Sequence, residues 1–264
     1  MRISFFFFFL FFINFSVFCF GTKESTNNIN PAISLKEQNK NGHFIIRNFN
    51  NELTVLGISN KMLRHNDEII SAKEDAARKI AMYFGIQGRI EIINSTGSST
   101  FDYFHNYEKE ILIDENYENF LDQLTFDPQS DVLKTNEGVF ISFKYKPTTA
   151  ININYNAKIV SGRPSWTRNH DKPGITGYVS SVGFSRTFRY LKDTVNAAVE
   201  DAIATMIADL STQVNAREVS VMENSSSSVI NTISEGRLIN FQIIEIWFEP
   251  GTRSVFVLAI AKTE

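Results

Sequence analysis

The residue types that most often carry acid, base or metal chemistry are sparse in this chain. Its four histidines, His43, His65, His105 and His170, form no i, i+4 pair and have no carboxylate at metal-ligand spacing. Catalysis by a general base or a metal requires several such groups to converge. The pattern predicts solvated surface histidines, and we expect no catalytic, cofactor-binding or metal-ligating residue.

Two pairs of adjacent carboxylates are the next candidates for acid/base work. They are Glu74-Asp75 and Glu200-Asp201, each inside an expected helix. Neighbouring helix positions point about 100° apart, so the two carboxylates of a pair do not converge. We interpret both pairs as the solvated shoulder of a helix.

The two tryptophans, Trp166 and Trp247, are candidates for contact with a partner protein. An exposed tryptophan often anchors an interface, whereas a buried one belongs to the core. Trp247 alternates with Ile246 and Phe248, so its side chain faces opposite to theirs on a strand. Both alternatives remain open at this stage.

Charge argues against nucleic acid as a partner. The chain of 264 residues has a net charge of -3 and a pI near 5.9. Binding to nucleic acid needs clustered cationic surface that displaces counterions. We therefore expect partners of another class.

The N-terminus has the pattern of a secretory signal. Phe5–Phe20 is an uncharged apolar run of 16 residues, which is short for a membrane-spanning helix of about 20 residues. We expect a signal peptide at 1–21 and a flexible polar tether at 22–42. The protein is then exported to the periplasm or the outer-membrane side of the cell envelope.

The single cysteine, Cys19, lies at the end of this apolar run. One cysteine cannot form an internal disulfide. Two processing routes compete. Cleavage after Gly21 leaves a soluble chain, whereas Ser16-Val17-Phe18-Cys19, taken as a relaxed lipobox, makes Cys19 an acylated N-terminus and lipid anchor.

An internal duplication organises the rest of the chain. Val55–Ser59 matches Ser181–Ser185 in residue type, and the match continues without a gap through an Ala-rich helix. Leu124–Pro128 then matches Ile246–Pro250. We predict an α+β fold with two modules, 43–147 and 160–264, joined by a connector at 148–159.

Each module is expected to be a βαβ unit followed by a hairpin, with one helix packed on a mainly antiparallel sheet. The two modules should superpose with Gly57 on Gly183, Ala76 on Ala202 and Phe126 on Phe248. Ala202 should be buried and Glu200 exposed. The expected elements are strands Leu53–Ser59, Arg89–Asn94, Gly177–Ser185 and Arg217–Met222, helices Asn66–Phe84 and Lys192–Leu210, and hairpins of Phe120–Phe126 with Val139–Tyr145 and of Asn240–Phe248 with Val255–Ala261.

The second module resembles the LPP20-like lipoprotein family of bacterial envelope proteins. The resemblance rests on Arg163-Pro164-Ser165-Trp166, on the strand Gly177–Gly183, on the alanines of the helix and on Glu245-Ile246-Trp247. This family is similar to the N-terminal domain of a flagellar outer-ring protein. The resemblance implies a non-catalytic envelope component, and some members are associated with the flagellar basal body.

Two functions follow from these observations. The first is a non-enzymatic interaction or structural protein of the cell envelope, with a protein partner in the envelope or the flagellar basal body. The alternative is a periplasmic protein that binds a small ligand or a glycan in a cleft between the modules.

Overall fold

A computed structural model describes residues 34–48, 51–96, 103–146, 153, 155, 157–168, 172–186, 189–214, 220–224, 227–252 and 254–264, without the side chains of 92–107 and 211–232. The predicted signal peptide at 1–21, Cys19 and the tether as far as residue 33 lie outside the described residues. Among the described residues, no helix has the length and apolar character needed to cross a bilayer.

The elements alternate between helices and strands along the chain. The helical segments are α1 (Leu35–Lys40), α2 (His65–Phe84), α3 (Leu191–Val214) and the 3-10 turns η1 (Tyr117–Gln123) and η2 (Ser165–Arg168). The strands are β1 (His43–Ile45), β2 (Leu53–Asn60), β3 (Ile86–Thr96), β4 (Tyr103–Ile113), β5 (Val132–Lys134), β6 (Gly138–Tyr145), β7 (Ile159–Val160), β8 (Arg163–Pro164), β9 (Val179–Ser185), β10 (Ser220–Asn224), β11 (Ser227–Phe248) and β12 (Val255–Thr263).

Strand β11 is the spine of the larger sheet, in which β4, β3, β11, β12 and β9 follow one another as neighbours. Along one edge of β11 lie β3 and then β1, and β10 and β12 also pair with it. A smaller sheet has the order β2, β6, β5. All pairs are antiparallel, which agrees with the expected α+β class.

The two long helices cover different sheets. Helix α2 packs on β2 and β6, and helix α3 packs on β9, β12 and β11. The other face of β2, with Leu56 and Ile58, joins the core around α3. Each half of the chain therefore contributes to a shared core.

The expectation of one self-contained sheet in each module is wrong. Strands β1, β3 and β4 belong to the first module in sequence but pair within the large sheet of the second. The long strand β11 extends beyond the segment that pairs with β12, and its first part pairs with β3. Backbone groups of a strand need partners along its whole length, and β3 and β4 supply them here.

Three features of the strand and helix contact do recur at matching positions. Gly57 and Gly183 each lie against helix backbone, and a Cβ at either would overlap the carbonyl oxygen of Ala72 or Ala198. The strand pairing also has the same register, because Ser59 faces Val139 in one half and Ser185 faces Val255 in the other.

The third recurring feature is a helix carboxylate that accepts a backbone N–H from the free edge of the strand. Asp75 Oδ2 accepts from Ile58 N at 2.9 Å, and Asp201 Oδ2 accepts from Phe184 N at 2.8 Å. Both carboxylates therefore accept backbone hydrogen bonds from strand edges. Asp75 is 1% exposed, so the interpretation of this residue as solvated is wrong.

The hairpins differ between the halves. Segment Phe120–Phe126 is largely the 3-10 turn η1, and β5 takes the place beside β6. By strand pairing, Phe248 faces Val255, whereas the matching Val139 faces Lys134. The predicted equivalence of Phe126 and Phe248 is therefore wrong, because a strand position is defined by its pairing partner.

Other expectations at the helices are confirmed. Ala76 and Ala202 are fully buried, and Glu200 is exposed, where it forms an ion pair of 2.7 Å with Lys109. The predicted tether is interrupted by α1, whose Gln38 Oε1 accepts the backbone N–H of Ile45 at 2.7 Å. That bond fixes α1 against β1.

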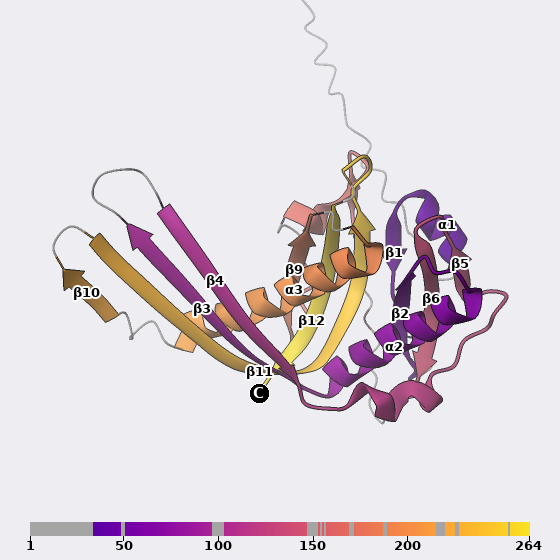
Figure 1. The fold of residues 1–264 in the computed structure, drawn as a ribbon, viewed down its shortest axis with the longest axis horizontal. Helices are drawn as coiled ribbons and strands as arrows, with labels where there is room; N and C mark the ends of the chain where they lie inside the picture. Colours follow the sequence, from indigo (N-terminus) through magenta and orange to yellow (C-terminus); the bar gives the residue numbers. More distant parts are fainter. Residues whose placement is uncertain are drawn as a thin grey trace, which may run out of the picture.

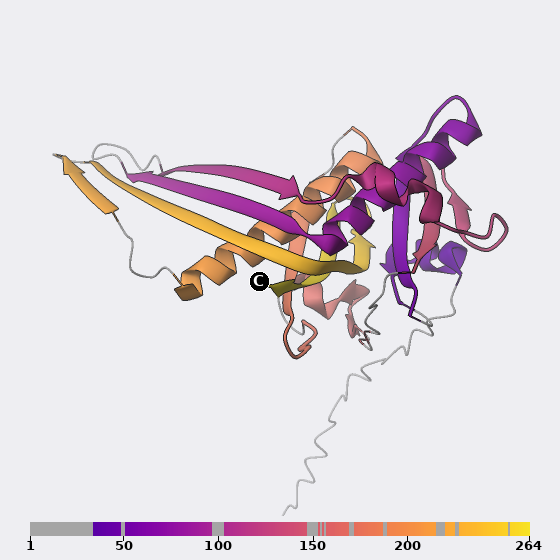
Figure 2. The ribbon, with the colours of Figure 1, turned by 90° about the horizontal axis from the view of Figure 1, so that it is seen from below.

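The molecule consists of a body and a long β arm. In Figures 1 and 2, β3, β4, β10 and the first part of β11 extend together away from the sheets of the body. Helix α3 underlies only the near part of this arm, where Gly88 makes room for Ile207. We use the term β arm for these four strand segments.

Candidate functional site

The site lies on the face of the large sheet that is turned away from α3. His43 pairs with Trp247, and Ile45 pairs with Glu245, two residues before Trp247. Side chains at alternate positions share a face, so His43, Glu245 and Trp247 lie side by side. The connection between the halves covers them with Trp166 of η2, which is fully buried.

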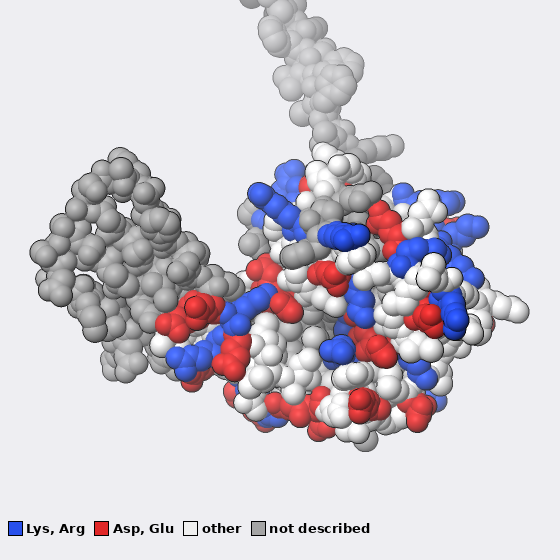
Figure 3. Space-filling model, viewed as in Figure 1, with Lys and Arg blue, Asp and Glu red and all other residues white. Residues whose placement is uncertain are grey.

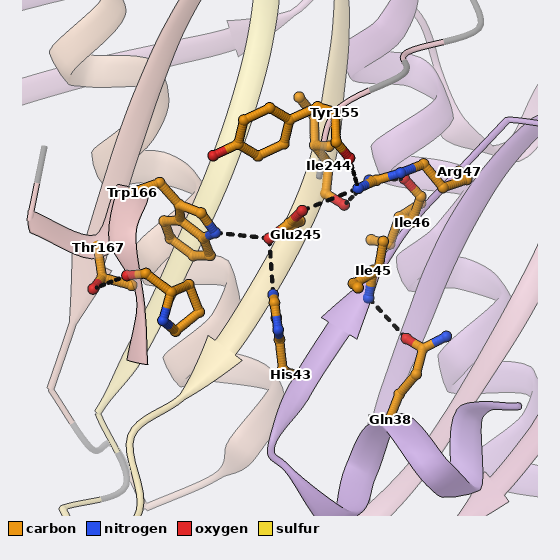
Figure 4. A network of polar contacts seen from close by, with 11 residues as sticks. Gln38, His43, Ile45, Ile46, Arg47, Tyr155, Trp166, Thr167, Ile244 and Glu245 are labelled. Carbon is orange, nitrogen blue, oxygen red and sulfur yellow. Dashed lines mark hydrogen bonds and ion pairs between the residues drawn. The ribbon is translucent and has the colours of Figure 1, made fainter. Parts of the chain in front are cut away.

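Glu245 is the centre of a buried polar network and is 0% exposed (Figure 4). Its Oε2 accepts from Trp166 Nε1 at 2.7 Å and from His43 Nε2 at 2.8 Å. Its Oε1 accepts from Arg47 at 3.0 Å. A single carboxylate thus joins β1, the connection and β11.

Arg47 extends the network to the backbone. Its guanidinium also donates to the carbonyl oxygens of Ile46 at 3.1 Å, Ile244 at 3.3 Å and Tyr155. A buried carboxylate is stable only when its charge is paired and its lone pairs accept hydrogen bonds. Arg47 supplies that charge, and His43 adds a further hydrogen bond to the same carboxylate.

A pocket of about 810 Å³ opens beside this network. His43 and Trp247 form part of its wall, which sets the network next to the open space. The other described lining residues are Asn39, Lys40, Asn41, Gly42, Thr135, Glu137, Phe140, Ile159, Gly162, Pro164, Leu191, Phe248, Glu249, Pro250 and Gly251. They come from both halves and from the connection, so the pocket lies at their junction, and its size is typical of small-ligand sites.

The structure corrects the expectations for two of the predicted site residues and one histidine. Trp166 and Trp247 are 0% and 3% exposed, so neither presents an indole to a partner protein. His43 is 5% exposed, so the prediction of a surface histidine is wrong for it. The pairing of β1 with β11, which joins residues far apart in sequence, brings it to Glu245.

His65 does not join this site. His65 Nδ1 lies 3.0 Å from Glu68 in the first turn of α2. The hydrogen bond with His65, together with contacts to Met62 N and Lys61, lowers the pKa of Glu68 to about 2. The side chain of His105 and all of His170 lie outside the described residues.

A second buried ion pair lies under β2. Lys79 Nζ is 2.6 Å from Asp75 Oδ2 and donates to Leu56 O at 2.8 Å. The pair thus satisfies both a backbone N–H and a backbone C=O on the free edge of β2. The two charged groups bond to each other and to the backbone of β2, so we assign the pair a structural role.

On the face shown in Figure 3, the charges of the described residues are not concentrated in one site. On the face in Figure 3, acidic and basic side chains of the described residues are intermixed. Within the described parts of the chain, no group of three or more His, Cys, Asp or Glu side chains is placed to hold a metal ion.

Comparison with known proteins gives no relative: no family model, curated protein or solved structure matches this chain.

Sequence reasoning missed Glu245 and Arg47 as members of a site. In the sequence, Glu245 belongs only to the pattern before the final hairpin. One signal was available, since a charged residue within the apolar run Phe241–Phe248 of an expected buried strand requires a partner.

Proposed function

We propose that this protein is a non-enzymatic component of the bacterial cell envelope that is exported and binds another envelope protein. The β arm is the observation that carries the proposal. A sheet that leaves the body and keeps open edges offers backbone N–H and C=O groups to a partner strand. The outer edge of β4 has no paired strand within the described residues.

The resemblance to LPP20-like lipoproteins agrees with this proposal and suggests the flagellar basal body as one location of the partner. We also propose that the two halves derive from one duplicated module. The recurring glycine, carboxylate and strand register support the duplication, and the sharing of strands in the large sheet came later in that scheme.

Cross-linking in cells tests the binding role of the arm. A photo-reactive residue is placed at Ile233, an exposed position on the arm strand β11, and in a control at Val160, an exposed position on β7. The proposal predicts a cross-linked envelope protein from position 233 and none from position 160. Equal cross-linking from both positions, or none from 233, contradicts it.

A shortened arm provides the second test. Ile92 and Tyr107 are directly paired, so residues 93–106 can be replaced by Asn-Gly, the favoured two-residue hairpin turn. The folded body should remain, and capture of the partner identified by cross-linking should fall at least about tenfold, or about 1.4 kcal/mol. Unchanged capture by a folded variant would exclude the arm.

Cys19 decides how the protein is held in the envelope. An acyl chain contributes about 0.8 kcal/mol for each buried methylene, so lipidation would anchor the chain. Under this proposal Cys19→Ser releases the protein into the soluble fraction. Intact mass of the mature wild-type chain that begins with unmodified Thr22 refutes the anchor.

Binding of a small ligand is a second candidate function, and the pocket at the junction of the two halves favours it. The sequence analysis expects a ligand of this kind to bind in a cleft between the modules. A small molecule bound there would contact both halves at once.

A further inference from the structure

We propose that two loops on one side of the body bind an anionic lipid bilayer, with Leu63 inserted among the acyl chains and arginines placed at the lipid headgroups. The loops are residues 61–64, between β2 and α2, and residues 186–190, between β9 and α3. We use the term tip loops for these two segments. The proposal goes beyond the proposed function, because it uses neither the β arm nor the pocket.

The exposure of Leu63 is the first observation. At 106%, Leu63 is as open to solvent as in an extended peptide, and it is the most exposed of the large apolar side chains in the described residues. Its neighbour Met62 is 37% exposed. The loop has a fixed base, because Met62 N donates to the buried Glu68 Oε1 at 3.1 Å. A partner that removes this leucine from water therefore gains free energy.

The second tip loop has a similar combination of side chains. Tyr190 is 46% exposed, and the guanidinium of Arg189 lies 5.3 Å from the centre of its ring. A tyrosine suits the boundary between a membrane and water, because its ring is apolar and its hydroxyl is polar. Both tip loops thus place an exposed apolar side chain beside an arginine.

The charge of the tip loops is positive, although the whole chain has a net charge of -3. Neither loop contains an acidic residue, and their cationic residues are Lys61, Arg64, Arg186 and Arg189. Lys61 is 3.0 Å from Glu68, whereas the three arginines form no ion pair with any described residue. The carboxylates nearest in sequence, Asp67 and Asp193, lie in the first turns of α2 and α3, where they favour the helix N-termini.

The two tip loops project from the same side of the body (Figure 2). Hydrogen bonds hold the elements that carry them together. Lys192 N, at the start of α3, donates to Asn60 Oδ1 at the end of β2 at 3.0 Å, and Lys192 Nζ donates to Ser71 Oγ of α2 at 3.2 Å. A broad, flat partner can therefore contact both loops at once.

The shape and charge of the tip favour a bilayer over a folded protein. A side chain that anchors a protein interface works best at the centre of the interface, where surrounding contacts exclude water. Leu63 has no such surround, as its full exposure shows. A bilayer encloses an inserted side chain by itself, and its anionic headgroups attract lysine and arginine side chains near the surface.

Co-sedimentation with lipid vesicles measures the interaction. The mature chain from Thr22 is used, so that neither the apolar run Phe5–Phe20 nor an acyl group on Cys19 contributes. Vesicles of phosphatidylcholine with about 30% phosphatidylglycerol should bind it at least about tenfold more tightly than phosphatidylcholine alone. The difference should shrink as the salt concentration rises from about 0.05 M to about 0.5 M. Absence of binding to the anionic vesicles, or equal binding to both kinds, overturns the proposal.

A fluorescent label identifies the position that enters the bilayer. The sequence has one cysteine, Cys19, so the mature chain from Thr22 can carry a single new cysteine for an environment-sensitive dye. With Leu63→Cys, the emission should shift to the blue on anionic vesicles. With the control Val160→Cys, at a 47% exposed position on β7, it should not. An equal shift at both positions, or no shift at 63, refutes insertion of the tip.

Matched substitutions separate the apolar and the cationic contributions. Leu63→Asp should weaken binding to the anionic vesicles at least about tenfold, whereas Val160→Asp, with the same change of charge, should have a much smaller effect. Arg64→Gln should weaken it about fivefold, and Lys36→Gln, an exposed cation of α1, should weaken it less. All four positions are exposed, so the variants should fold. Equal effects within either pair contradict the proposal.

Discussion

The contact between β2 and α2 and the contact between β9 and α3 have a glycine and a carboxylate at matching positions. The negative charge of that carboxylate is compensated differently in the two contacts. Asp75 is buried against Lys79, whereas Asp201 is partly exposed and the position matching Lys79 is Thr205. The shared positions bring helix and strand together. The residue at the position of Lys79 and Thr205 determines whether the helix carboxylate can be buried with its charge paired.

The same contrast applies to the polar network. Strand pairing places Leu133 in the first half where the second half has Trp247, so the first half lacks the aromatic neighbour of Glu245. The polar network around Glu245 therefore has no counterpart at the matching strand position of the first half.

Removal of the counterion in the first half should have the largest effect. Lys79→Met leaves Asp75 charged, buried and unpaired, and frees Leu56 O, so we expect a loss of about 3–5 kcal/mol of unfolding free energy. Thr205→Val, which removes only a hydroxyl bonded to Asp201 O, should cost less than about 1 kcal/mol. Equal losses in urea unfolding would contradict the contrast.

Substitution of the two matching glycines, Gly57 and Gly183, should lower stability by a similar amount. Gly57→Ala and Gly183→Ala each place a methyl group against helix backbone, and we expect each to destabilise the protein by about 3 kcal/mol. Gly174→Ala is the control, because a Cβ there meets nothing within 4 Å. A near-neutral result at one of the two glycines would show that the contacts are not equivalent.

The pKa of Glu68 in the first half predicts a pH effect on stability. The pKa of Glu68 is lowered in the folded protein from 4.5 to about 2, chiefly by His65. A lowered folded-state pKa stabilises the fold above the unfolded value and loses that effect as the pH falls. The melting temperatures of wild type and Glu68→Gln should therefore differ at pH 7 and converge between pH 4.5 and 2.

The matching position in the second half is Thr194, whose Oγ1 donates to Tyr190 O at 3.1 Å. Thr194→Val should change the melting temperature by the same amount at both pH values, since no ionisable group is removed. A gap for Glu68→Gln that persists unchanged at pH 2 would be inconsistent with the lowered pKa.

Local pattern predicted the two long helices and strands β2, β6, β9 and β12 well, but it missed β4 and the first part of β11. The apolar period placed α2 and α3 within a few residues of their ends, and the repeated glycine and alanine positions predicted where each helix approaches a strand. These features depend on residues near one another in sequence. The prediction of a strand at Phe120–Phe126 is wrong because its apolar residues also suit a 3-10 turn that covers α2.

The candidate site could not be predicted in the same way. Its members come from β1, the connection and β11, and pairing over such sequence distances is not encoded in a local period. The register of β1 against β11 brings His43 to Glu245, and the packing of η2 brings Trp166 to it. Sequence pattern alone therefore detected a strand at this position but not its buried charge.

The most direct test of the central claim, that the two halves repeat one strand and helix contact, follows the backbone amide protons of Ile58 and Phe184 by NMR. Each amide donates to a helix carboxylate, at 2.9 Å and 2.8 Å, and bonds to charged acceptors are the stronger kind. We predict that Asp75→Asn shifts the Ile58 amide proton upfield and that Asp201→Asn does the same to Phe184, with neither variant affecting the other amide. A response at one amide only, in variants that remain folded, would contradict the claim.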